Sequence, residues 1–314
     1  MKTPHPFTTI DDQIRILQSR KLDFRSVEKA KEALSLYGYY NIINGYKDNY
    51  VNSMGECDEY KDGTTFEQIY SLFSLDHAVR NQIMLLMLDV EEMLKASAAY
   101  VVGENCGHLH EEYLDITKYR NKQKNNPAFS LGATISKLKD VYNSGKDPIR
   151  HNRVTYGDVP PWVLFKGTYF STIVTFIGFF KGPMKAELIS MLYDIPQDAV
   201  TPEVKRIFMD SLLMFTDYRN LCAHAGRAYN FSPKYTVRSF APGFSNADLG
   251  LNFSPDDSEP MRIGMLLTSL ALFKKRAYAQ QLLSLVERSI NTHCTAYPDD
   301  LDYLLDSMGV RGSV

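Results

Sequence analysis

The sequence predicts an all-α protein in which four or five core helices form a bundle. Apolar residues recur with a period near 3.6 over residues 66–102, and residues 162–180 are strongly apolar. Thr201, Pro202 and Glu203 have the residue types of a helix start, with a cap, a proline in the first turn and then an acid. With 314 residues, 44% of them hydrophobic and 23% charged, the chain can bury a large core in one domain or two.

Residues 1–63 are expected to form a helical extension that packs on the core. Two threonines shortly before two aspartates predict the start of a helix over residues 11–20, and Ser26 is the expected cap of a second helix over residues 27–36. Residues 37–51 are rich in tyrosine and asparagine and contain two glycines, which favours a turn and a short helix.

The longest expected helix covers residues 66–102, with Thr64 or Thr65 as its cap and Gly103 at its end. Because eleven residues nearly complete three turns, several of its polar side chains fall near one stripe. This stripe contains Asp76, Arg80, Met87, Glu91 and Lys95. Spacing alone leaves two interpretations open: a solvated face with an ion pair four residues apart, or a polar seam that faces another helix.

The rest of the chain adds further helices and loops. Residues 64–230 are predicted to form the helical core, and residues 231–314 a loop and carboxy-terminal helices of the same globule. The helix that starts at Pro202 is expected to run to a motif around His224 and to end near Gly226. The remaining expected helices cover residues 130–143, 162–180, 184–193, 261–290 and 298–308.

Two loops carry clusters of cationic side chains. The first lies within residues 104–129 and the second within residues 144–158. Each can be read either as a solvated loop or as a surface that grips a nucleic-acid backbone. The candidate nucleic-acid-binding residues are Lys118, Arg120, Lys122, Lys124, Arg150 and Arg153.

Composition argues against several other classes. The formal net charge of -2 gives no global basic field, so nucleic-acid contact has to use local patches. Four scattered cysteines lack the paired spacing of a zinc site, and no metal or cofactor is expected. The amino terminus lacks a signal-peptide core, and no apolar stretch is long and uninterrupted enough to span a bilayer. We therefore expect a cytoplasmic protein without membrane contact.

Residues 218–230 carry the strongest chemical signal. Arg219 offers a permanent cation with a forked donor array suited to phosphate, and His224 can both donate and accept a proton near neutral pH. Asn220 and His224 are four residues apart and share one face of a helix, whereas Arg219 is turned partly away and reaches back with its long side chain. We predict a site that cleaves phosphodiesters, with Arg219, Asn220 and His224 as its catalytic residues.

This segment resembles the Arg-x4-His signature of the HEPN ribonuclease superfamily. Its extended form, Arg-Asn-x-Cys-Ala-His-x-x-Arg-x-x-Asn, is similar to the Abi family of abortive-infection proteins, especially the AbiD/AbiF branch. Residues 39–48 resemble that family's INGYK block, residues 66–92 its helix with Asp-x-x-x-Arg and a later glutamate, and residues 160–164 its Pro-x-Trp block. The resemblance spans roughly residues 35–230 and implies a HEPN-like helical bundle with additional amino- and carboxy-terminal helices.

The resemblance implies metal-independent cleavage of RNA, in which the 2'-hydroxyl attacks the adjacent phosphate and leaves a 2',3'-cyclic phosphate. His224 would transfer a proton, Arg219 would neutralise the phosphorane oxygens, and Asn220 would orient His224 or hold a phosphate oxygen. It also favours the polar seam over the solvated face, and it leaves the rest of the motif to contact RNA or support the helix end. The supporting residues are Asp76, Arg80, Glu91, Arg227, Tyr229 and Asn230.

Because one histidine cannot easily act as acid and base at once, the resemblance implies a homodimer that joins two His224 side chains. It further implies an endoribonuclease toxin of an abortive-infection or toxin–antitoxin system, held silent by a structured non-coding RNA or by a protein antitoxin. Gly226 stands where some HEPN toxins carry a tyrosine that a partner nucleotidyltransferase modifies, so that route of control is not expected. Two alternatives are kept: an RNA-binding module without catalysis, and a helical sensor or scaffold that recognises a phage protein.

Overall fold

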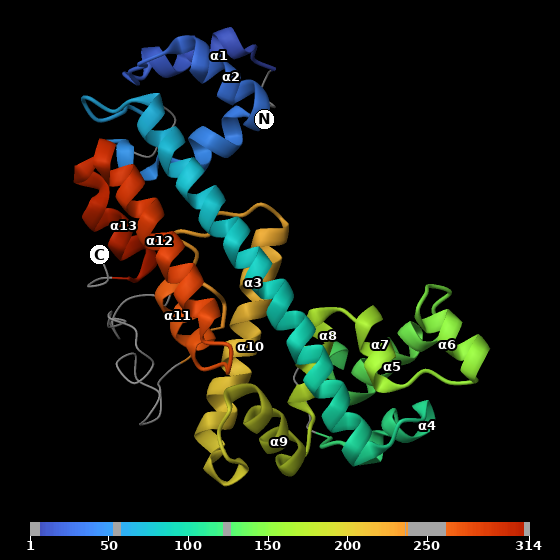
Figure 1. Ribbon diagram of the computed structural model, residues 1–314. Helices are drawn as coiled ribbons and strands as arrows, with labels where there is room; N and C mark the ends of the chain where they lie inside the picture. The colour runs from blue at the N-terminus through green and yellow to red at the C-terminus, as the bar shows by residue number, and fades with distance from the viewer. Residues whose placement is uncertain (1–6, 53–57, 122–126, 236, 238–261, 311–314) are drawn as a thin grey trace.

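The molecule is all-α, as the sequence predicts, and is built along one long helix (Figure 1). The computed structural model describes residues 7–52, 58–121, 127–235, 237 and 262–310. Within these ranges the only β-type pairings are isolated bridges, between Asp23 and Thr65 and between Val51 and Tyr60.

The α-helices follow one another with short 3-10 turns between several of them, and a π-helix, η1, precedes the longest. In chain order they are α1 (Ile10–Ser19), α2 (Val27–Tyr37), η1 (Tyr40–Asn44), α3 (Phe66–Cys106), α4 (His110–Tyr113), α5 (Leu131–Tyr142), α6 (Ile149–Tyr156), α7 (Pro161–Leu164), α8 (Phe170–Gly178), α9 (Gly182–Tyr193), α10 (Pro202–Ala223), α11 (Ile263–Ala271), α12 (Ala277–Ala296) and α13 (Leu301–Met308).

The helix α3 is the axis of the molecule. Its N-cap Thr65 accepts a hydrogen bond from the backbone N–H of Gln68, which confirms the predicted start. The predicted end at Gly103 is wrong, because the helix continues past this glycine, whose carbonyl accepts a hydrogen bond from the backbone N–H of Gly107 at 3.2 Å. A Cβ at Gly103 would make an ordinary contact with the ring of Trp162, 3.7 Å away. The helix ends instead before Gly107, whose φ of 101° is a conformation that glycine adopts at little cost.

Other helices pack around α3 on several sides. The helices α10 and α12 lie along it, α11 packs between these two, and α7 and α9 contact its carboxy-terminal half (Figure 1). The core side of α3 is apolar and fully buried at positions such as Ile83, Val90 and Leu94. The carboxy-terminal end of α10 comes to lie beside the first half of α3, where Arg80 donates a hydrogen bond to the carbonyl of Ala225.

Three predicted elements differ from the structure. The apolar segment 162–180 is interrupted between α7 and α8, because a Cβ at Gly167 would come 2.4 Å from Cδ1 of Ile149 and the glycine turn lets α6 pack there. The predicted basic loop 144–158 contains α6, whose single buried residue, Ile149, gives no periodic signal. The predicted helix over 261–290 is two helices, α11 and α12.

The described helices include none that is long and apolar enough to cross a membrane. The division of the chain at residues 63 and 230 stays a prediction.

Candidate active site

The predicted motif lies where α10 ends. Ala225 takes a left-handed φ of 55°, and its N–H donates to the carbonyl of Cys222 at 3.2 Å. The N–H of Gly226 donates to the carbonyl of Leu221 at 2.9 Å. These two bonds form a Schellman closure, which satisfies carbonyls that the helix end leaves free.

The left-handed position of this closure is Ala225, one residue before the glycine expected to end the helix. Gly226 is needed for a different reason. A Cβ there would lie 2.5 Å from Cδ1 of Leu221 and 3.3 Å from its carbonyl oxygen. The turn therefore excludes any larger residue at position 226 unless Leu221 moves.

A groove of about 400 Å³ runs along the exposed side of this helix end. Asn220 and His224, both exposed, line it together, as their spacing predicts. Across the groove lie Ser232 and Lys234, and the backbone N–H of Lys234 donates to Asp217 at 2.8 Å. The Asp217 carboxylate also lines the groove, where it accepts hydrogen bonds from the backbone N–H groups of Lys234 and Tyr235. The other polar groups are an imidazole, an amide, a hydroxyl and an ammonium group, which can bind a phosphodiester.

Arg219 points to the neighbouring face, toward α3. Its Nε lies 3.6 Å from Oε2 of Glu91, and Lys95 donates to the other oxygen of Glu91 at 2.7 Å. The Glu91 side chain is 13% exposed, whereas that of Arg219 is 31% exposed. The separation is longer than a hydrogen bond, so Glu91 neutralises Arg219 without fixing its guanidinium group tightly.

Asp76 binds the backbone of the segment that follows His224. Together with Arg80 and Arg227 it forms the group of contacts that we call the clasp. Its side chain is fully buried, and the Tyr46 hydroxyl donates to its Oδ2 at 2.6 Å. The backbone N–H groups of Ala228 and Tyr229 donate to Oδ1 at 2.9 and 2.6 Å. Burial raises the pKa of the Asp76 carboxyl, and these hydrogen bonds oppose that effect.

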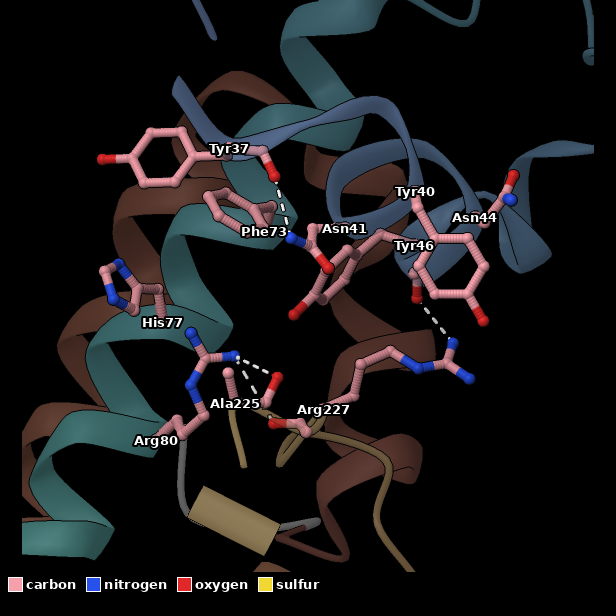
Figure 2. A pocket seen from close by; sticks show the side chains of 12 residues that line it. Tyr37, Tyr40, Asn41, Asn44, Tyr46, Phe73, His77, Arg80, Ala225 and Arg227 are labelled. Carbon is pink, nitrogen blue, oxygen red and sulfur yellow. Dashed lines mark hydrogen bonds between the residues drawn. The ribbon is translucent and has the colours of Figure 1, made fainter. Parts of the chain in front are cut away.

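Two arginines complete the clasp (Figure 2). Nη1 of Arg80 lies 3.7 Å from Asp76 and donates to the carbonyls of Ala225 and Gly226 at 3.3 and 3.4 Å. Arg227 donates to the carbonyl of Gly45 at 2.5 Å and to Asp48 at 3.2 Å. Both guanidinium groups therefore tie the turn to segments that are distant in sequence.

Tyr229 continues the same packing inward. Its ring stacks on that of Tyr46 with centroids 5.8 Å apart, and its hydroxyl lies 2.9 Å from the hydroxyl of Tyr303 in α13. Asn230 follows as a half-buried residue. Of the predicted supporting residues, Asp76, Arg80, Arg227 and Tyr229 come together in the clasp, while Glu91 contacts Arg219.

Cys222 belongs to the motif but lies under the turn. Burial, with a smaller contribution from the charge of Asp76, raises the pKa of its thiol to about 12. The thiol is therefore protonated near neutral pH and is not a nucleophile.

The predicted nucleic-acid-binding cations that the structure describes lie away from the groove. Lys118 and Arg120 are exposed beyond the carboxy-terminal end of α3, and the helix between Arg80 and Cys106 is about 39 Å long. Arg150 is exposed on α6, near the same end of the molecule (Figure 1). Arg153 is held by hydrogen bonds to the carbonyls of Tyr142 and Ser144, and Lys122 and Lys124 lie outside the described residues.

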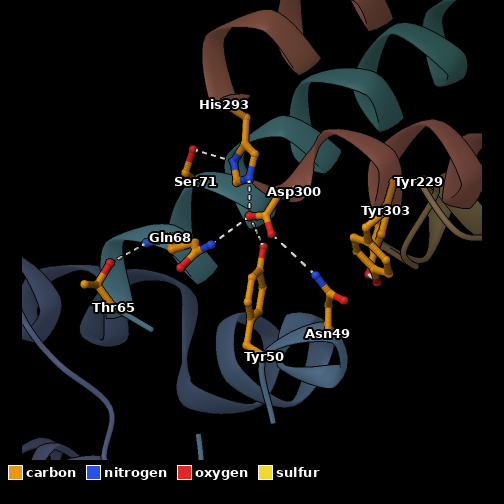
Figure 3. A network of polar contacts seen from close by, with 9 residues as sticks. All are labelled: Asn49, Tyr50, Thr65, Gln68, Ser71, Tyr229, His293, Asp300 and Tyr303. Carbon is orange, nitrogen blue, oxygen red and sulfur yellow. Dashed lines mark hydrogen bonds and ion pairs between the residues drawn. The ribbon is translucent and has the colours of Figure 1, made fainter. Parts of the chain in front are cut away.

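A second polar network joins the carboxy-terminal helices to α3 (Figure 3). Asp300 accepts hydrogen bonds from Tyr50 and Gln68 at 2.8 and 2.9 Å, and His293 lies 2.9 Å from both Asp300 and Ser71. The order Ser71, His293, Asp300 is that of a hydrolase triad. However, His293 is 1% exposed and Asp300 is saturated by other donors, so this network holds the fold.

Sequence reasoning missed Tyr46, His293 and Asp300 as partners of these networks, and Ser232 and Lys234 as groove residues. The family's INGYK block, which contains Tyr46, was a signal for the first. Across the described ranges, no three His, Cys, Asp or Glu side chains gather as a metal-binding group.

Comparison with known proteins agrees with the motif. The model of a family described as Abi-like protein matches residues 32–230, which include α3, α10 and the turn after it. No curated protein and no solved structure matches the chain.

Proposed function

Since the chain belongs to the Abi-like protein family, we propose that it is an abortive-infection toxin that cleaves RNA without a metal ion and so arrests growth during phage attack. Family membership indicates the role in phage defence, and the ribonuclease activity is our proposal. The observation that carries it is the shared exposure of Asn220 and His224 in one groove, with Arg219 on the adjacent face of α10.

In the proposed reaction, the 2'-hydroxyl of one nucleotide attacks the adjacent phosphorus, and the bond from phosphorus to the 5'-oxygen of the next nucleotide breaks. His224 accepts the hydroxyl proton or donates a proton to the leaving oxygen. Arg219 exchanges its loose pairing with Glu91 for the phosphorane oxygens, where its charge stabilises the transition state. Asn220 and Lys234 hold the remaining polar atoms of the phosphate.

A homodimer would supply the second proton-transfer group. On α3, between Arg80 and Glu91, Leu85 and Leu88 are 56% and 45% exposed. Such an apolar surface next to a polar seam suits a second copy of the chain, which would bring its own His224. We expect Leu88→Asp to shift the protein from dimer to monomer in sedimentation experiments and to lose activity. A monomeric wild-type protein that cleaves RNA would contradict this part of the proposal.

The exposed cations Lys118, Arg120 and Arg150 are proposed to bind RNA apart from the cleavage groove. A structured RNA antitoxin held there would keep the toxin silent, and a protein antitoxin is the competing possibility. Electrostatic contacts to phosphates predict binding that weakens steeply as salt rises.

The test compares wild type, His224→Ala and His108→Ala on total RNA and tRNA in EDTA, after co-purified RNA has been stripped. His108 is an exposed histidine at the far end of α3 and serves as the matched control. We expect fragments with cyclic-phosphate ends from wild type and His108→Ala but not from His224→Ala. Circular dichroism checks that each variant is folded.

The pairing of Arg219 with Glu91 favours one alternative, an RNA-binding module that does not cleave. That alternative predicts salt-dependent RNA complexes with intact RNA in every sample. Equal cleavage by folded His224→Ala protein would exclude the proposed mechanism.

A further inference from the structure

The turn that ends α10 has a second cavity on its other side (Figure 2). This pocket has a volume of about 360 Å³, within the range of small-ligand sites, and is distinct from the His224 groove. It is formed where the end of α2 and the π-helix η1 meet α3 and the turn. Gly226 lines both cavities, so the pocket and the groove share one wall.

One side of the pocket is aromatic. Tyr40 is 76% exposed at its mouth, and the rings of Tyr37 and His77 pack on Phe73 with centroids 5.1 and 6.0 Å away. Tyr40 belongs to the π-helix, a rare conformation that occurs often at functional sites. Figure 2 draws the Tyr40 ring apart from this aromatic cluster, and an exposed ring of this kind is a surface on which a planar ring can stack.

The same helix presents two amides. Asn41 and Asn44 are exposed and line the pocket beside Tyr40, and Asn41 donates to the carbonyl of Tyr37 at 2.8 Å. An asparagine amide offers donors and an acceptor in one plane, which matches the edge of a nucleobase. Stacking and edge recognition are thus available from one short segment.

Two cationic side chains also line the pocket. Figure 2 shows the guanidinium group of Arg80 near His77 and that of Arg227 beside Tyr40. Among the described residues that line the pocket, none is acidic. Arg80 lies 3.7 Å from Asp76 and Arg227 lies 3.2 Å from Asp48, but neither carboxylate lines the pocket. The charged groups that face the pocket therefore suit an anionic ligand with a planar ring, which is the chemistry of a nucleotide.

We propose that this pocket binds one unstacked base of the RNA strand, next to the nucleotide whose phosphate is cleaved in the His224 groove. The inference rests on the proposed function. The shared wall at Gly226 puts neighbouring nucleotides on the two sides of one turn. Recognition of a splayed base restricts the substrate to single-stranded RNA, because a paired base is not free to enter.

The test uses a 2'-O-methyl RNA octamer that carries one 2-aminopurine, whose fluorescence is quenched by stacking. This probe lacks the attacking hydroxyl, so binding is measured without cleavage. The variants are Tyr40→Ala, Tyr40→Phe and Asn44→Ala, with Tyr100→Ala as control, a tyrosine that is 58% exposed elsewhere on α3. We expect about tenfold weaker binding for Tyr40→Ala, since stacking of a base on an aromatic ring contributes about 1–3 kcal/mol. Asn44→Ala should bind about fivefold more weakly, since a hydrogen bond to the base edge contributes about 1 kcal/mol. Tyr40→Phe keeps the ring and should bind like wild type, as should Tyr100→Ala.

Binding by Tyr40→Ala and Asn44→Ala that stays within twofold of wild type would overturn the inference. So would a free 2-aminopurine ribonucleotide that competes as tightly as the octamer binds, because the pocket would then serve a free nucleotide. Failure of the two proposals is distinguishable. If wild type cleaves RNA and Tyr40→Ala binds the octamer as tightly as wild type, the pocket proposal alone is rejected. If octamer binding depends on Tyr40 but no protein cleaves RNA, the pocket proposal is supported and the ribonuclease activity is rejected.

Discussion

Replacing Asp76 tests whether the clasp, and not α10 alone, holds the candidate site. The Asp76 side chain is fully buried and accepts hydrogen bonds from the Tyr46 hydroxyl and from two backbone N–H groups, those of Ala228 and Tyr229. In Asp76→Ala all three donors lose their acceptor inside the protein. Asp76→Asn keeps an oxygen for the two backbone groups and replaces by an amide the Oδ2 atom that faces Tyr46 and Arg80.

The expected cost follows from these contacts. A buried donor left without a partner costs about 1–3 kcal/mol, so three donors predict a loss of roughly 3–5 kcal/mol in Asp76→Ala after local relaxation. Asp76→Asn should lose about 1–3 kcal/mol, because the Tyr46 hydroxyl can rotate and accept from the new amide, whereas Arg80 loses its charged partner. The exposed Asp89→Asn on the same helix should change stability by less than about 0.5 kcal/mol.

The assay is urea unfolding followed by the helical circular dichroism signal, together with hydrogen exchange at Ala228 and Tyr229. Both amides should exchange faster in Asp76→Ala than in Asp89→Asn. A folded Asp76→Ala protein within about 0.5 kcal/mol of wild type, with both amides still protected, would refute the clasp.

Two further outcomes follow from single contacts. Burial alone would raise the pKa of Asp300, but hydrogen bonds from His293, Gln68 and Tyr50 outweigh it and hold that pKa below its ordinary 3.8. A depressed carboxyl pKa stabilises the folded state above pH 3.8 and ceases to do so as the pH falls through the lower folded-state value. Asp300→Asn should therefore be less stable than wild type at pH 7, and the gap between their unfolding free energies should narrow below pH 3.8; a constant gap would exclude this origin. Gly226→Ala should destabilise by about 1–3 kcal/mol through its clash with Leu221, whereas Gly145→Ala, which meets nothing within 4 Å, should be near neutral. Equal melting temperatures for these two glycine variants would show that the turn adapts freely.

Helix starts were predictable because their signal is local. Thr9, Ser26, Thr65 and Thr201 each accept a hydrogen bond from a backbone N–H in the first turn of the helix they precede. Helix ends and breaks were predicted less well, since they depend on partners. Gly103 resembles a terminator in sequence, yet the left-handed glycine that follows the helix is Gly107, and spacing does not tell the two apart.

The candidate site was predictable only along α10. Spacing alone puts Asn220 and His224 on one face and turns Arg219 aside. It also allows Asp76 and Arg80 to pair, but it does not reveal that they bind the backbone that follows His224. Those contacts join positions about 150 residues apart, and no local pattern records them.

The contacts around the turn after α10 give a physical reason why the motif extends beyond His224. Proton transfer requires heavy atoms to approach within about 2.6–3.2 Å, so His224 has to be held in place, yet it sits at the C-cap, where a helix frays. The Schellman turn, Asp76 and Arg80 hold the backbone on its carboxy-terminal side, and Arg227 ties the same turn to η1. Residues beyond His224 can therefore control catalysis without touching the scissile phosphate. Because the pocket beside Tyr40 is lined by the same turn, replacing Asp76 in the clasp should weaken both oligonucleotide binding and RNA cleavage. Loss of Glu91 should remove the counter-charge that Arg219 and Lys95 share and leave binding in the pocket unchanged.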